Sequence, residues 1–246
     1  MSATVRMETK KVGRNSQHLY FVDGDPLVDP TVPMPGCSTV AGFVDKGGDG
    51  LIYWGIDQYI ASGERNGFVT ARNEAGALGT QLHAEIEYYI TNREHPQDPS
   101  MLYSNWYASV GERVGQWIST EKLVYHGGLG YGGTTDCIGV VDGVVTLFDW
   151  KSANFIDGKG KQKKNLGQVG HASQLGGYLL ALEYMGWPAI TQAAIVYVAR
   201  DTKDVEWQWV NIPTATALFT ASLQVYRATR NKAFLKEGSG TWPTPI

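Results

Sequence analysis

The chain contains 246 residues, of which 43% are hydrophobic, 11% aromatic and 18% charged. These values are ordinary for globular proteins, so they exclude a disordered chain and a fibrous repeat. The formal net charge of −3 excludes a polybasic protein with a cationic surface throughout, but it allows one local basic path for nucleic acid.

The chain has two cysteines, Cys37 and Cys137, which are too few for a four-cysteine zinc site or iron–sulfur cluster. Because it has no apolar run of about 18 residues and no apolar leader, we expect a cytosolic protein without membrane attachment. We expect one domain over residues 1–246, made of an N-terminal hairpin extension (1–32), a core (33–236) and a tail (237–246).

The first half of the sequence predicts a hairpin followed by helices. Residues 17–30 alternate weakly between apolar and polar side chains and contain a turn at Asp23–Pro26. Residues 33–50 are rich in loop-forming residues. Apolar residues then recur at the helical period in three segments, residues 51–63, 73–91 and 104–118.

The second half predicts a sheet covered by helices. After a strand at 121–125 and a glycine-rich bend, two apolar runs (134–141 and 144–151) flank Asp142-Gly143, a strong hairpin signal. Because both runs are apolar on both faces, we predict an α/β fold with helices on each side of a central sheet. The remaining predicted elements are a helix at 172–185, strands at 190–199 and 205–212, and a helix at 213–236.

The predicted hairpin brings charged side chains together. If Asp142-Gly143 is a two-residue turn, Asp136 lies directly opposite Asp149. Lys151 lies on the same face as Asp149, because side chains alternate along a strand. Opposed carboxylates repel each other, and a bridging Mg²⁺ or Mn²⁺ would relieve the repulsion and suit phosphodiester hydrolysis. The alternative is a salt bridge at an exposed hairpin end.

Two helices carry polar pairs at a spacing of four residues. His83 and Glu87 share one face of the predicted helix at 73–91, and Gln174 and Tyr178 share one face of the helix at 172–185. A neutral imidazole at His83 would be a further metal ligand, whereas a surface or core histidine is the ordinary alternative.

These segments together resemble the PD-(D/E)XK nuclease superfamily in its RecB-like exonuclease branch, similar to phage exonucleases and mitochondrial genome maintenance exonucleases. The resemblance covers about residues 33–200. The matching segments, in chain order, are Gly79-Thr-Gln-Leu-His83 with Glu87, Gly133-Thr-Thr-Asp136, Asp149-Trp150-Lys151 and Gln174-Leu-Gly-Gly-Tyr178.

The resemblance implies a restriction-endonuclease-like core, with a central mixed β-sheet flanked by helices. It implies that Asp136, Asp149 and Lys151 are catalytic, and that a Mg²⁺ or Mn²⁺ ion is held by His83, Asp136, Asp149 and the backbone carbonyl of Trp150. Gln174 and Tyr178 would lie near the DNA, with Glu87 and Glu121 in supporting positions. We expect no iron–sulfur cluster, and no use of ATP because the chain lacks a Walker-type phosphate loop.

Substrate contact is expected from the loop that follows Lys151. Four lysines lie close together there, namely Lys159, Lys161, Lys163 and Lys164. They are candidates to hold the phosphate backbone, although lysines in such a loop also serve solubility.

The expected function is a metal-dependent DNA exonuclease that acts on single-stranded ends in phage-type recombination or replication, with a single-strand annealing protein as the partner that the resemblance suggests. If it is phage-encoded, it acts in the bacterial host cytosol. Two alternatives remain: a structure-specific or restriction-type endonuclease on the same core, and a non-catalytic DNA-binding recombination protein.

Overall fold

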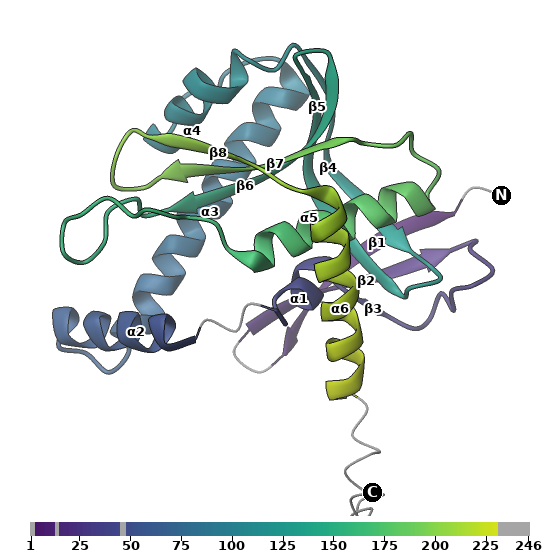
Figure 1. Cartoon of the computed structure of the whole chain (residues 1–246), viewed down its shortest axis with the longest axis horizontal. Coiled ribbons are helices and arrows are strands. Elements are labelled where there is room, and N and C mark those ends of the chain that lie inside the picture. Colours follow the sequence, from purple (N-terminus) through teal and green to yellow (C-terminus); the bar gives the residue numbers. More distant parts are fainter. Residues whose placement is uncertain (1–2, 13–14, 45–47, 231–246) are drawn as a thin grey trace, which may run out of the picture.

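A five-stranded mixed sheet forms the centre of the protein, with strand order β4-β5-β6-β7-β8 (Figure 1). The computed structural model describes residues 3–12, 15–44 and 48–230. The strands are β4 (Gln116–His126), β5 (Tyr131–Val141), β6 (Val144–Ala153), β7 (Gln192–Ala199) and β8 (Val205–Trp209). Strands β6 and β7 are parallel, and the other neighbouring pairs are antiparallel.

The sheet separates two hydrophobic cores. On one face lie α1 (Cys37–Ala41), α5 (Val169–Tyr184) and α6 (Ile212–Arg230); on the other lie α3 (Gly67–Asn92) and α4 (Met101–Trp106). Adjacent residues of β6 belong to different cores, because side chains alternate between the two faces of a strand. Leu147 lies in the core on the α5 side, and Phe148 lies in the core on the α3 side. The predicted α/β class, with a mixed sheet covered on both faces, is confirmed.

The parallel pair depends on α5. Strand β6 leads through a loop into α5, which returns the chain so that β7 runs beside β6 in the same direction. A parallel pair requires such a crossover, usually a helix. The crossover also brings α5 over the sheet face that carries Asp149 and Lys151, because these residues alternate with Phe148 and Trp150 of the opposite core.

A second, smaller sheet contains β1 (Thr4–Val12), β2 (Asn15–Asp23) and β3 (Met34–Pro35). It joins the main body through a small core that includes Tyr20, Met34 and Tyr125. The predicted N-terminal hairpin was wrong in its main pairing, because β2 pairs along its whole length with the preceding β1. The chain that follows the predicted turn at Asp23–Pro26 adds only the two residues of β3.

Two helices differ from the prediction. The predicted helix at 104–118 comprises α4 and a π-helical turn (Tyr107–Gly111), and Trp117 belongs to β4 instead. Trp117 stacks on Trp106 with 5.8 Å between ring centroids. The spacing of these two residues in the sequence suggested one helix, but the contact joins a helix to a strand. Helix α3 begins at Gly67, ahead of the predicted start.

Helix α2 (Gly48–Ser62) lies apart from the sheet and packs on α3 (Figure 1). Trp54 and Phe68 join the two helices edge to face, with 5.0 Å between ring centroids. Helix α6 is described to Arg230, so residues 231–236 of the predicted last helix and the predicted tail lie outside the described residues. Across the described ranges, no helix is both long enough and apolar enough to span a membrane.

Candidate active site

The site lies where the sheet splits between β5 and β6. The two strands pair from Val141–Val144 to Cys137–Phe148, and the ladder stops there although both strands continue. Beyond this point the backbone N–H of Trp150 donates to Asp136 Oδ2 at 2.7 Å. The turn register is therefore as predicted, but the Asp136–Asp149 backbone pair does not form. The carboxylate of Asp136 accepts the hydrogen bond from the Trp150 N–H in place of a backbone carbonyl of β5.

Asp149 and Lys151 form a buried ion pair in the gap. Asp149 is 0% exposed, and Lys151 Nζ lies 2.8 Å from its Oδ1 and 2.7 Å from its Oδ2. Only the Oδ1 contact has hydrogen-bond geometry, so Oδ2 is a buried oxygen without a hydrogen bond. Burial alone would lower the pKa of Lys151, but Asp149 and Asp136 outweigh burial and raise it. Lys151 is therefore a fixed cation at neutral pH.

Three side chains from different elements meet beside this pair. His83 of α3 places Nε2 2.9 Å from the backbone oxygen of Trp150 and 3.8 Å from Asp136 Oδ2. Its other nitrogen, Nδ1, lies 4.0 Å from Oε1 of Glu121 on β4. Ligand atoms of His83, Glu121 and Asp136 all lie within 4.8 Å of one another, so these residues could hold a metal ion together.

The close packing of charges changes how His83 and Asp136 titrate. Burial lowers the pKa of His83, but Asp136, Glu121 and the Trp150 carbonyl outweigh burial and raise it to about 9. Burial raises the pKa of Asp136 to about 6, although the neighbouring His83 and Lys151 favour the carboxylate. In the metal-free protein His83 is therefore an imidazolium at neutral pH. It supplies the positive charge that the carboxylates need.

Glu121 reaches the group through an unusual backbone conformation. Its φ is +45°, in the left-handed region that non-glycine residues rarely adopt. The flanking ladder pairs are Thr120–Cys137 and Lys122–Thr135, which sets Glu121 beside Asp136. Strain of this kind concentrates at functional sites, and it has no signal in the sequence.

Helix α5 supplies Gln174 and Tyr178 from the other face. Gln174 Nε2 donates to Tyr178 Oη at 2.7 Å, which joins the pair predicted from its spacing. Burial raises the pKa of Tyr178 well above its ordinary value, and the negative charges of Asp136 and Asp149 add to this rise. The ring passes so close to Gly133 that a Cβ there would lie 2.6 Å from Tyr178 Cε1, so only glycine fits.

The remaining predicted residues differ in position. Glu87 is exposed and makes no hydrogen bond or ion pair within the described ranges, so its predicted support of His83 has no contact behind it in the structure. The carboxylate nearest His83 Nδ1 comes from Glu121 instead, because the ring turns toward the sheet.

The four loop lysines are all exposed. Asp157 accepts hydrogen bonds from the backbone N–H groups of Lys159 and Lys161, which shapes the loop. Of the four lysines, only Lys163 lines the large cavity beside the site.

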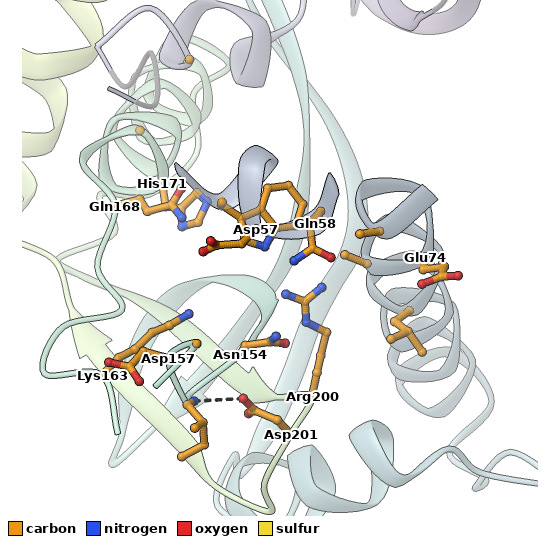
Figure 2. Close-up of a pocket in the computed structure, with 18 of the residues that line it drawn as sticks. Asp57, Gln58, Glu74, Asn154, Asp157, Lys163, Gln168, His171, Arg200 and Asp201 are labelled. Carbon is orange, nitrogen blue, oxygen red and sulfur yellow. Dashed lines mark hydrogen bonds between the residues drawn. The ribbon is translucent and has the colours of Figure 1, made fainter. Parts of the chain in front are cut away.

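This cavity has a volume of about 1530 Å³ and lies between α2 and α3 on one side and the loop after β6 on the other (Figure 2). Trp54, Gln58 and Arg200 line it together with Gln174. The sequence reading missed Trp54 and Arg200. No local motif marks them, because they come from a helix outside the sheet and from the residue after β7.

Comparisons with known proteins leave the family open. No protein-family model matches the chain, and no curated protein matches it. Among solved structures, it is similar to one titled "Crystal structure of SSO0001", with 15% identity, a TM-score of 0.33 and coverage of 68% of each chain. A likeness this weak supports no conclusion about activity.

Proposed function

We propose that the protein is a metal-dependent nuclease with a PD-(D/E)XK-type centre, acting as an exonuclease on single-stranded DNA ends. The observation that carries this proposal is the meeting of Asp136, Asp149 and Lys151 with His83 in the gap between β5 and β6. Burying such charges without a chemical role costs stability, which disfavours a purely structural explanation.

The donor set fits a small divalent cation. Asp149 Oδ2 is buried without a hydrogen bond, and carboxylate oxygens of Asp136 and Glu121 lie near the His83 ring. Carboxylate, carbonyl and imidazole donors together suit Mn²⁺, and the oxygens suit Mg²⁺. Asp136, Asp149, His83 and the Trp150 carbonyl would hold the ion, with Glu121 beside them.

The side chains then divide the work of phosphodiester hydrolysis. When bound, the cation supplies Lewis acidity at the phosphoryl oxygen and a more acidic water as the nucleophile. Lys151, protonated at neutral pH, stabilises the negative charge that develops on the phosphate and does not act as a base. Asp149 orients the Lys151 ammonium through its hydrogen bond. Tyr178 stays protonated and can donate a hydrogen bond.

The test is a gel assay with matched linear and circular single-stranded DNA, in Mg²⁺, in Mn²⁺ and in EDTA. We expect loss of the linear strand alone, and only with metal. Cleavage of the circle would replace the exonuclease with an endonuclease. If neither these strands nor duplex ends are cut, the nuclease proposal is wrong and a non-catalytic DNA-binding protein is the better explanation.

A further inference from the structure

The large cavity and the candidate active site share two helices, α3 and α5. Helix α3 lines the cavity at Glu74 and Leu78 and, five residues further along, carries His83 into the site. Gln174 of α5 lines the cavity and bonds to Tyr178 beside the buried carboxylates. A chain-like ligand lying in the cavity would therefore contact the two helices that supply His83 and Tyr178.

Arg200 has no hydrogen-bond partner in this cavity. Its guanidinium makes no hydrogen bond or close ion pair within the described ranges, although the charge of Asp201 acts on it, and its Nε is fully buried. Figure 2 shows the side chain pointing toward the middle of the cavity. An arginine with an unsatisfied buried donor is suited to a phosphate, which accepts two hydrogen bonds from a guanidinium at once.

The charges that line the cavity are arranged by side. Lys163 and Arg200 lie on the side formed by the β6 loop and the end of β7, whereas Asp57 and Glu74 lie on the α2–α3 side (Figure 2). Among the residues lining the cavity from α2 and α3, none is a lysine or arginine.

The two acidic residues on the cationic side are already engaged. Asp201 accepts hydrogen bonds from the backbone N–H groups of Phe155 and Ile156, at 2.8 and 2.9 Å. Asp157 accepts from the N–H groups of Lys159 and Lys161. These carboxylates hold the loop in shape, and the backbone donors offset part of their charge. Lys163 and Arg200 interact electrostatically with these carboxylates but make no hydrogen bond with them in the described part of the chain, so their donors can still bind a phosphate.

From this arrangement we infer that the cavity binds one strand of DNA, with its phosphates on Arg200 and Lys163 and its bases toward Trp54 and Gln58 on the α2–α3 side. A duplex is disfavoured, because its second phosphate backbone would face Asp57 and Glu74. Base stacking on an aromatic ring and phosphate contact on the opposite side are the usual elements of single-strand binding. This inference rests on the proposed nuclease function and names the residues that hold its single-stranded substrate.

Binding is measured by fluorescence anisotropy in EDTA, so that no metal-dependent cleavage intervenes. The probes are a labelled single strand of about 12 nucleotides and a hairpin duplex of similar size. The test variants are Arg200→Gln and Lys163→Gln. The matched controls are Arg72→Gln and Lys10→Gln, which remove the same charge from exposed positions outside the cavity lining.

We expect Arg200→Gln to weaken single-strand binding about tenfold, the size typical of a lost charged hydrogen bond, with a smaller loss for Lys163→Gln. The controls change binding less than about twofold. Arg200→Gln also reduces the slope of log affinity against log salt by about 0.7, the value for one phosphate contact on a single strand. A residue needed only for folding would not change that slope selectively.

The outcomes separate this inference from the proposed function. If the wild-type protein cuts linear DNA but the test variants bind like their controls, the cavity inference is wrong and the nuclease proposal stands. Equal affinity for the duplex also overturns the inference. If Arg200→Gln weakens binding as expected but the wild-type protein cuts no DNA with metal, the cavity inference stands and the nuclease proposal fails. Melting curves confirm that each variant is folded.

Discussion

The two halves of the candidate active site are built differently. The first half is Asp149 and Lys151, which come from one strand, lie two residues apart and form an ion pair with side chains 0% and 22% exposed. The second half is His83, Glu121 and Asp136, which come from three elements and have side chains 29%, 36% and 10% exposed. The first half holds a cation that stays protonated at neutral pH, whereas the second half contains a histidine that, in the proposed mechanism, would exchange its proton for a metal ion.

This contrast shows how one site can combine permanent and replaceable positive charge. Lys151 is bound to the chain and protonated at neutral pH, so it stays whether or not metal is present. In the proposed mechanism, the His83 imidazolium would carry positive charge only until a metal ion displaced its proton. Variants of Lys151, Asp136, His83 and Glu121 test this division, in decreasing order of expected effect.

Replacing Lys151 should have the largest effect. We expect Lys151→Ala to slow cleavage by at least about 100-fold, because the developing phosphate charge loses its stabilising cation. It also leaves Asp149 as an unpaired buried charge, which costs about 3 kcal/mol of folding stability. Single-strand binding by the folded fraction is largely kept. Cleavage is measured on linear single-stranded DNA, and stability by urea unfolding.

The double variant Asp149→Asn with Lys151→Gln separates these effects, because it removes both charges from the buried pair. Stability should recover relative to Lys151→Ala, while cleavage stays lost. Wild-type cleavage rates in either variant would contradict the assigned role of Lys151.

The next effect concerns Asp136, the residue of the second half that also accepts a hydrogen bond from β6, the strand of the first half. Asp136→Asn keeps an acceptor for the Trp150 N–H but removes a charged ligand. We expect Mn²⁺ affinity, measured by calorimetry, to fall by more than the roughly 10–100-fold loss typical of an outer-shell partner. Asp142→Asn in the exposed hairpin turn is the matched control and should bind Mn²⁺ like the wild type. An unchanged affinity in Asp136→Asn would place the metal elsewhere.

The raised pKa of His83 predicts how metal binding depends on pH. Because its pKa is raised to about 9, His83 is protonated at neutral pH and must lose that proton before its nitrogen can bind metal. Apparent Mn²⁺ affinity should therefore rise about tenfold per pH unit between about pH 6.5 and pH 8.5, and level off above pH 9. Below about pH 6 the dependence becomes steeper, because Asp136 also takes up a proton.

His83→Asn removes this titration. Calorimetry across the same pH range should show a weaker but nearly pH-independent Mn²⁺ affinity. If the His83→Asn variant keeps the tenfold dependence, the titrating group is not His83.

The smallest expected effect is on Mn²⁺ affinity when one of the two predicted supporting carboxylates, Glu121 or Glu87, is replaced. Glu121 lies beside His83, whereas Glu87, predicted for that role from its spacing, is exposed and distant from any described partner. We expect Glu121→Gln to lower Mn²⁺ affinity about tenfold, as loss of a supporting group does. Glu87→Gln should leave it unchanged. The reverse order in the same calorimetric measurement would show that the helix spacing was the better guide.

Local sequence patterns predicted the fold correctly where a feature depended on one element or one turn. The Asp142-Gly143 turn has positive φ at both residues, and the register that it implied holds as far as Cys137–Phe148. The two-sided apolar runs of β5 and β6 correctly indicated helices on both faces. The prediction failed for Trp117, because an apolar residue at helical spacing can equally meet its partner from a strand.

The sequence by itself determined which side chains share a strand or helix face, because the periods of two and 3.6 residues are properties of the local backbone. It thereby determined the Asp149–Lys151 pair and the Gln174–Tyr178 pair. Only the tertiary structure decided that Glu121 rather than Glu87 lies beside His83, and that Arg200 lines the cavity. Those placements depend on where the sheet splits and how α2 and α3 pack beside it, and long-range packing leaves no period in the sequence.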